Sequence, residues 1–178
     1  MKTKDFLILS SVTKDDMQAK ISRLQKPLSV RGRRVPESLQ TLTIGELFTL
    51  QSIRTEHDAI IVPCRVLLNM DEEEVMKAEA SEVMGFIKWV AEEMEKINKL
   101  FERTKIPPTA EEKQAGVDKL NFGAFGVLDW YAQRMGYLDH EAVEHVPWMR
   151  VYKCLEMDAQ RTLYERRLRD VYANKGKQ

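Results

Sequence analysis

The sequence predicts an all-α fold, a single-domain irregular helical bundle preceded by a basic, partly irregular N-terminal arm. Three observations support this prediction. Helix-start residues recur along the chain: Thr43, Asp71, Thr109 and Asp139 as N-caps, and Pro147 at a first helical position. Residues 83–101 carry a sustained apolar seam. The 178 residues are 43% hydrophobic and 31% charged, which is enough for one ordinary core. We place the arm at residues 1–40 and the helical domain at 41–178.

The first 40 residues form the basic arm. They contain nine Lys and Arg residues against four acids, whereas residues 71–95 contain nine acids against two lysines. Such opposite segments attract each other, either within one chain or between copies. A short apolar run at residues 6–12 predicts a strand, because it is too brief for an independent helix. Thr13 then predicts the start of a short amphipathic helix.

Two prolines bound a segment at residues 27–36 that contains Gly32 and three arginines, Arg31, Arg33 and Arg34. Proline and glycine at this density predict a loop. Two interpretations of the arginines stay open, an anion-binding or docking arm and a solvated linker. The linker is favoured, because no aromatic residue is interleaved with the arginines. If the segment does dock, these arginines are the polar candidates for partner binding.

The middle of the chain carries three helix signals. Thr43 and Glu46 have capping-box spacing before a short amphipathic stretch. Pro63 lies within a strongly apolar run at residues 59–70, which predicts a helix start or a kink at that position. The acids at residues 71–74 stand where the positive end of a helix dipole favours them, so they predict another helix start.

The clearest periodicity is at residues 83–101, where apolar residues spaced 4-3-4-3-4 form one seam. Additional apolar residues widen this seam, so several neighbours must cover the helix. We therefore expect the central core helix, with a dimer seam and self-association as the alternative. Any part of the face that the core leaves uncovered is the expected docking groove, and Met84, Trp89 and Met94 are its partner-binding candidates. The helix should end before Pro107.

The last third of the chain contains every Trp and Tyr residue except Trp89. Thr109 begins a second capping box, and Gly136 is expected to end a helix as its C-cap. For the final helix we expect four core-facing residues: Trp148, Val151, Leu155 and Leu163. We also expect one aromatic packing cluster, formed by Phe122, Phe125, Trp130, Tyr131, Trp148 and Tyr152.

No reactive constellation is present in the sequence. His140 and His145 lie five residues apart, about 140° around a helix, so both cannot face one zinc ion. Cys64 and Cys154 stand far apart in apolar contexts, which predicts buried thiols and no disulfide. We therefore expect no catalytic, cofactor-binding or metal-binding residue. No apolar run approaches the ~20 residues of a membrane span, so we expect a cytoplasmic protein.

Several segments resemble small helical proteins of tailed bacteriophages and prophages, of the tail assembly chaperone type. SLQTLTIGEL at residues 38–47 resembles the entry helix of these proteins, and EEV at 73–75 resembles their acidic helix start. A third element covers PTAEE at 108–112, AG at 115–116, FG at 122–123 and LD at 128–129. The last two are VEHVPWMRVYKCL at 143–155 and YERRL at 164–168. The resemblance covers about two thirds of the chain, and residues 1–37 have no counterpart.

This resemblance implies a non-catalytic protein that binds a long, apolar, helical tape-measure protein in the host cytoplasm before the tail tube closes around it. An aromatic- and Met-rich groove suits that task, because flexible side chains can shield apolar stripes and release them later. Two other classes stay open. One is a structural adaptor retained in the phage particle, and the other is a DNA-binding or regulatory helical module. No helix-turn-helix with a basic recognition helix supports the DNA-binding class, and the zero net charge does not favour nucleic acid.

Overall fold

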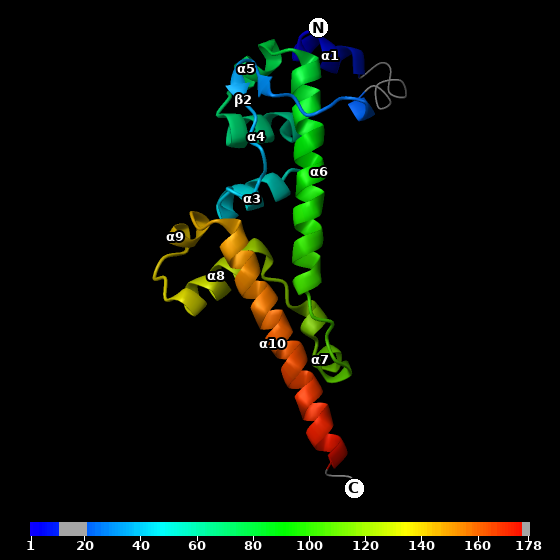
Figure 1. Ribbon diagram of the computed structural model, residues 1–178, viewed down its shortest axis with the longest axis vertical. Helices are drawn as coiled ribbons and strands as arrows, with labels where there is room; N and C mark the ends of the chain where they lie inside the picture. The colour runs from blue at the N-terminus through cyan, green and yellow to red at the C-terminus, as the bar shows by residue number, and fades with distance from the viewer. Residues whose placement is uncertain (11–20, 176–178) are drawn as a thin grey trace. The chain divides into compact units, whose positions relative to one another are not determined.

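The computed structural model describes residues 1–10 and 21–175, and the chain is mostly α-helical, as the sequence predicts (Figure 1). The elements of the first half are α1 (Thr3–Ser10), β1 (Ser29–Val30), β2 (Arg33–Arg34), α3 (Ile44–Gln51), α4 (Glu56–Leu68), α5 (Glu72–Lys77) and α6 (Ala80–Thr104). Those of the second half are α7 (Ala110–Gln114), the 3-10 helix η1 (Val117–Lys119), α8 (Gly123–Met135), α9 (His140–Glu144) and α10 (Trp148–Lys175). Within the described ranges, no helix is both long and apolar enough to cross a membrane.

The contacts divide the chain into two compact units. The N-terminal unit consists of Met1–Thr41 and Glu46–Lys96, and the C-terminal unit consists of Leu42–Gly45 and Ile97–Gln178. Residues 1–40, which the sequence sets apart as an arm, therefore share a unit with the helices α4 and α5 and with most of α6.

Two expectations for the arm are wrong, the strand at residues 6–12 and the solvated linker at residues 27–36. The apolar run at residues 6–12 does not form a strand, because α1 covers its described part. Thr3 anchors this helix, since its backbone nitrogen donates to the carbonyl oxygen of Ala78 at 3.0 Å and its hydroxyl donates to the same oxygen at 3.2 Å. A short apolar run does not distinguish helix from strand, so these tertiary contacts decide. The helix start expected at Thr13 lies outside the described residues.

The segment at residues 27–36 is a packed hairpin and not a solvated linker. β1 pairs antiparallel with β2, so that Val30 stands opposite Arg33. The two residues between the strands, Arg31 and Gly32, have φ values of 51° and 79°. Positive φ at both central residues is the geometry that matches the twist of a two-residue hairpin. Val30 is completely buried, so the hairpin contributes to the core.

Most of the expected helix ends are confirmed. Asp71 and Thr109 form complete capping boxes with Glu74 and Glu112. Asp139 caps α9, and Gly136 ends α8 in the left-handed conformation. Pro63 does not begin a helix, because α4 starts at Glu56 after its N-cap Thr55 and continues through the proline. The long seam helix α6 ends at Thr104, ahead of Pro107.

A short backbone pairing near the start of α10 joins residues 42–45 to the rest of the C-terminal unit. Thr43 and Pro147 form an isolated antiparallel bridge. On either side of it, the backbone nitrogen of Ile44 donates to Val146 at 2.8 Å, and that of Trp148 donates to Leu42 at 3.1 Å. This pairing explains why residues 42–45 belong to the second unit although they lie early in the chain.

Candidate partner-binding surface

The three apolar partner-binding candidates on α6 belong to the core. Met84, Trp89 and Met94 are only 6%, 8% and 9% exposed. The ammonium group of Lys26 lies 3.8 Å from the centroid of the Trp89 ring and covers it. These side chains therefore do not form an exposed groove, and the expectation that α6 keeps an uncovered face at them is wrong.

The cover over α6 comes from the arm. A Cβ placed on Gly85 would lie 2.5 Å from the carbonyl oxygen of Gln25, so the backbone of the arm crosses the helix at van der Waals distance there. One turn later, the ammonium of Lys88 donates to the carbonyl oxygen of Leu24 at 3.0 Å. Glycine permits this close approach because it has no side chain. The arm thus covers α6 from Gly85 to Trp89, where a partner was expected to bind.

Two of the three arginine candidates hold the hairpin in place. Arg33 pairs with Glu74 at 2.5 Å and donates to the carbonyl oxygen of Leu68 at 2.9 Å. The guanidinium of Arg31 donates to the carbonyl oxygen of Glu74 at 3.3 Å. The attraction predicted between the basic arm and the acidic segment is therefore satisfied within the chain. Arg34 is different, because it pairs with the exposed Glu37 at 2.9 Å and with no other residue in the described part of the chain.

The predicted single aromatic cluster is wrong. Trp148 is 2% exposed and packs with Tyr152 and Phe101, whose ring centroid lies 5.9 Å from that of Trp148. Phe122 and Phe125, in contrast, are 69% and 59% exposed. The buried face of α8 begins only at Leu128, so the two phenylalanines precede it. Leu163 on α10 is likewise exposed, although its spacing predicted a core position.

Exposed large apolar side chains concentrate in the C-terminal unit. Of the fourteen such residues in the described chain, three lie in the N-terminal unit and eleven lie at or beyond Leu120. One group is near α8: Leu120, Phe122, Phe125, Met135, Tyr137 and Leu138. The other is on α10: Met157, Leu163, Tyr164, Val171 and Tyr172. This concentration makes the C-terminal unit the candidate for partner binding.

A groove lies between α8 and the first turns of α10. Its volume is about 370 Å³, and its lining is mostly Met, Tyr and Cys with two cationic side chains: Tyr131, Met135, Met149, Arg150, Lys153 and Cys154. Flexible methionine side chains adapt to irregular apolar partners. The groove has no acidic residue in its lining, so it presents apolar surface with positive charge at its edge.

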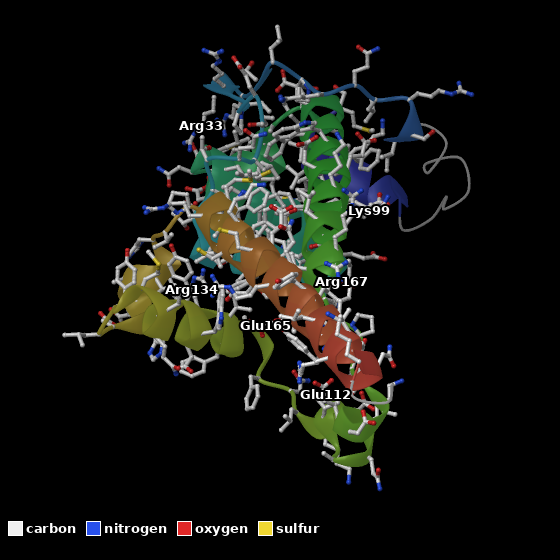
Figure 2. The ribbon with its side chains drawn as sticks, turned by 60° about the horizontal axis from the view of Figure 1, so that its bottom comes forward. Arg33, Lys99, Glu112, Arg134, Glu165 and Arg167 are labelled. Atoms are coloured by element: carbon white, nitrogen blue, oxygen red, sulfur yellow. The ribbon has the colours of Figure 1, made fainter. Side chains whose placement is uncertain are left out.

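Two ion pairs hold α10 against its neighbours in the same unit, and Figure 2 labels one member of each, Arg134 and Glu112. Arg134 at the end of α8 pairs with Asp158, and Glu112 of α7 pairs with Arg166 at 3.0 Å. Arg166 also donates to the carbonyl oxygen of Pro107 at 2.7 Å. The second half of α10 is therefore fixed on the side that carries Arg166, and the opposite side is left open.

The open side of α10 carries an apolar stripe formed by Met157, Tyr164, Leu168 and Val171. The first, second and fourth of these lie seven residues apart and are all exposed, and Leu168 is half-buried. We refer to these four residues as the α10 stripe. Sequence reasoning missed this stripe, although the heptad spacing was a usable signal.

The thiols, the Tyr152 hydroxyl and the His140 imidazole have different surroundings. Cys64 is completely buried, and burial raises the pKa of its thiol to about 12. Cys154 is a free, half-buried thiol. Burial, followed by a 3.0 Å hydrogen bond to Glu156, raises the pKa of the Tyr152 hydroxyl, which stays a protonated donor. His140 contacts Asp129 at 3.1 Å, and no group of three potential ligands is arranged for a metal among the described side chains.

A larger groove in the N-terminal unit is formed by α1, α5 and the start of α4. Its volume is about 790 Å³, and Leu7, Ile8 and Met76 supply its apolar lining. At its rim Lys77 pairs with Glu73, and the imidazole of His57 lies 3.1 Å from the Glu72 carboxylate.

Comparisons with known proteins found no match among protein families, curated proteins or solved structures.

Proposed function

We propose that this chain is a non-catalytic binding protein of the tail assembly chaperone type, which holds an apolar helical partner of the tape-measure kind in the cytoplasm during assembly. The observation that carries this proposal is the concentration of eleven exposed large apolar residues in the C-terminal unit. Such residues cost solubility unless a partner covers them for part of the protein's life. The segments that resemble the chaperone family add support, since three of the five lie within residues 108–168.

The chemistry of the surface suits a reversible grip. It combines Phe122 and Phe125 near α8 with Met135, Met149 and Met157 along the groove and α10. Aromatic side chains supply contact area, and methionines adapt to different apolar shapes. A chaperone must release its client when tube subunits arrive, and adaptable apolar contacts permit this better than buried ion pairs.

Co-expression with the adjacent long, helix-rich protein of its own gene cluster tests the proposal. We expect this chain to raise the soluble fraction of that protein and to co-purify with it. The double variant Phe122→Ser/Phe125→Ser should weaken the complex by about thirtyfold or more, since each exposed ring buries apolar area worth about 1–2 kcal/mol on binding.

The matched control is Leu28→Ser, because Leu28 is 91% exposed but lies in the N-terminal unit. It should leave recovery of the complex unchanged. The proposal is wrong if the partner is equally soluble with and without this chain and no complex is recovered.

A structural adaptor retained in the particle would use the same apolar surface, so binding alone does not separate the two roles. Mass spectrometry of purified particles does. A shed chaperone is absent from the particle, whereas an adaptor is present in a fixed ratio to the other tail proteins.

A further inference from the structure

The charged side chains that residues 157–175 of α10 place beside the α10 stripe are all of one sign. At 100° per residue, ten residues of α10 between 157 and 175 lie within roughly 80° of Tyr164. This set contains the four stripe residues, Arg161, Arg167 and Lys175, and it contains no acid. The three cationic side chains are exposed, and none of them has an ion-pair partner among the described residues.

The acids of this part of α10 point elsewhere. Asp158 lies roughly 120° around the helix from Tyr164 and pairs with Arg134. Glu165 and Asp170 lie roughly 100° and 120° from Tyr164. Figure 2 labels Glu165 and Arg167 on α10. The helix therefore separates its charges, with unpaired cations beside the apolar stripe and carboxylates away from it.

We propose that the α10 stripe binds an amphipathic helix of a partner protein whose apolar stripe is flanked by Asp and Glu. This inference rests on the proposed function and identifies the surface and chemistry of the contact. Met157 and Val171 are fourteen residues apart, about 21 Å along the helix, so the partner contributes about four helical turns. Its apolar side chains pack on Met157, Tyr164 and Val171, and its carboxylates pair with Arg161 and Arg167.

Charge selects this occupant over a second copy of the chain. Pairing two α10 stripes would bring three cations from each copy into one interface, with no acid among residues 157–175 of the same face of either. Because like charges repel, these cations disfavour a second copy of the chain as the partner. A helix with acidic flanks supplies the missing charge in either direction of pairing. Guanidinium groups also pair with carboxylates through two parallel hydrogen bonds, which adds geometric selection.

The composition of the stripe also favours a protein helix over nucleic acid. Three of its four residues are aliphatic or thioether side chains, and Tyr164 is its single aromatic ring. Binding of single strands depends on successive bases stacking on aromatic rings. An aliphatic stripe at heptad spacing instead matches the knobs and holes of a second helix.

Two synthetic helical peptides of about 20 residues, sharing one leucine stripe, provide the test. One peptide carries Glu at the flanking positions and the other carries Lys. We expect the full chain to bind the Glu peptide at least about tenfold more tightly than the Lys peptide at low salt, and the difference to shrink as salt is added. Fluorescence anisotropy of labelled peptides measures both affinities.

Charge reversal then locates the contact. The double variant Arg161→Glu/Arg167→Glu should abolish or invert the preference between the peptides. Arg169→Glu is the matched control, since Arg169 is exposed but lies roughly 140° from Tyr164, and it should change the affinity less than about threefold. Circular dichroism should show unchanged helix content in all variants.

Several outcomes would overturn the inference. Equal affinity for the two peptides, or an Arg169→Glu effect as large as that of the double variant, would show that no charge-selective contact lies on the stripe. Sedimentation equilibrium showing a dimer that Tyr164→Ser dissociates would assign the stripe to a second copy. Competition by a DNA duplex or single strand at equal concentration would assign it to nucleic acid.

The two proposals fail separately. If the Glu peptide binds as expected but the co-expressed partner gains no solubility, the chaperone role is wrong and the acidic-helix contact stands. If the co-expressed partner binds but the arginine variants leave that complex unchanged, partner binding stands and this surface is wrong.

Discussion

The N-terminal and C-terminal units differ in how completely their helices are covered. In the N-terminal unit, residues 24–27 close over α6, and Arg33 pairs with Glu74 between the hairpin and α5. In the C-terminal unit, α10 is 28 residues long but buries only four of them. Apolar seams exist in both units, yet among the described residues the seam is covered in the first unit and left exposed on α10 in the second.

Whether other segments of the chain cover an apolar helix face is a separate question from how apolar that face is. The face of α6 with Met84 and Trp89 is the more apolar one, and it is closed. The α10 stripe is less apolar, and it is open. A docking surface is expected where the apolar residues exceed what the chain itself covers, and here that is the C-terminal unit.

Thiol reactivity gives the largest contrast between the units. Burial raises the pKa of Cys64 from 9.0 to about 12, so its thiolate fraction at pH 8 falls about a thousandfold. We expect a disulfide reagent to modify Cys154 in the folded protein and to leave Cys64 unmodified until denaturant is added. Absorbance of the released thiolate reports the count. Rapid modification of two thiols in the native protein would contradict the closed core of the first unit.

Trp148→Ala should destabilise the protein by about 3–5 kcal/mol, because it removes a buried ring that packs against Phe101 and Tyr152. Urea denaturation followed by circular dichroism measures the change in the free energy of unfolding. Phe122→Ala removes a ring of similar kind from the exposed group and serves as the control, with an expected change below about 1 kcal/mol. Similar losses for the two variants would remove the distinction between core and open surface in the C-terminal unit.

Arg33→Gln should cost about 1 kcal/mol, since it removes the half-exposed pair with Glu74 and weakens the bond to the Leu68 carbonyl. Arg34→Gln is the control, because its pair with Glu37 is fully solvated and contributes close to zero. Urea denaturation at low and high salt measures both. Equal losses would mean that the hairpin is not held through Arg33.

Local structure was largely predictable from residues near each helix end. Asp71, Thr109 and Asp139 place their caps because the bonds they make span three residues or fewer. Gly136 ends α8 for a reason that is also local, because this position takes the left-handed backbone conformation that glycine adopts readily. The apolar run in residues 6–12 was misread, because its helical state depends on Ala78, more than 70 residues away.

The proposed surface was less predictable than the helices that carry it. Trp89 was assigned to a partner because nothing in its neighbourhood indicates that Lys26 covers it. Phe125 was assigned to the core because an isolated phenylalanine looks the same whether or not a neighbour reaches it. Heptad spacing of Met157, Tyr164 and Val171 was visible in the sequence, but its exposure was not.

By itself, the sequence determined that this chain is helical, where several of its described helices begin or end, and that its basic and acidic segments attract. These properties depend on hydrogen bonds within one turn, on periodicity and on charge, all of which can be read from residues that are close together in the sequence. Only the tertiary structure decided which apolar faces are covered, because coverage depends on chain that returns from far away. The arm packs on α6, whereas no described segment covers the exposed residues of the α10 stripe. The face of α6 is therefore part of a core, and the α10 stripe is a candidate docking surface.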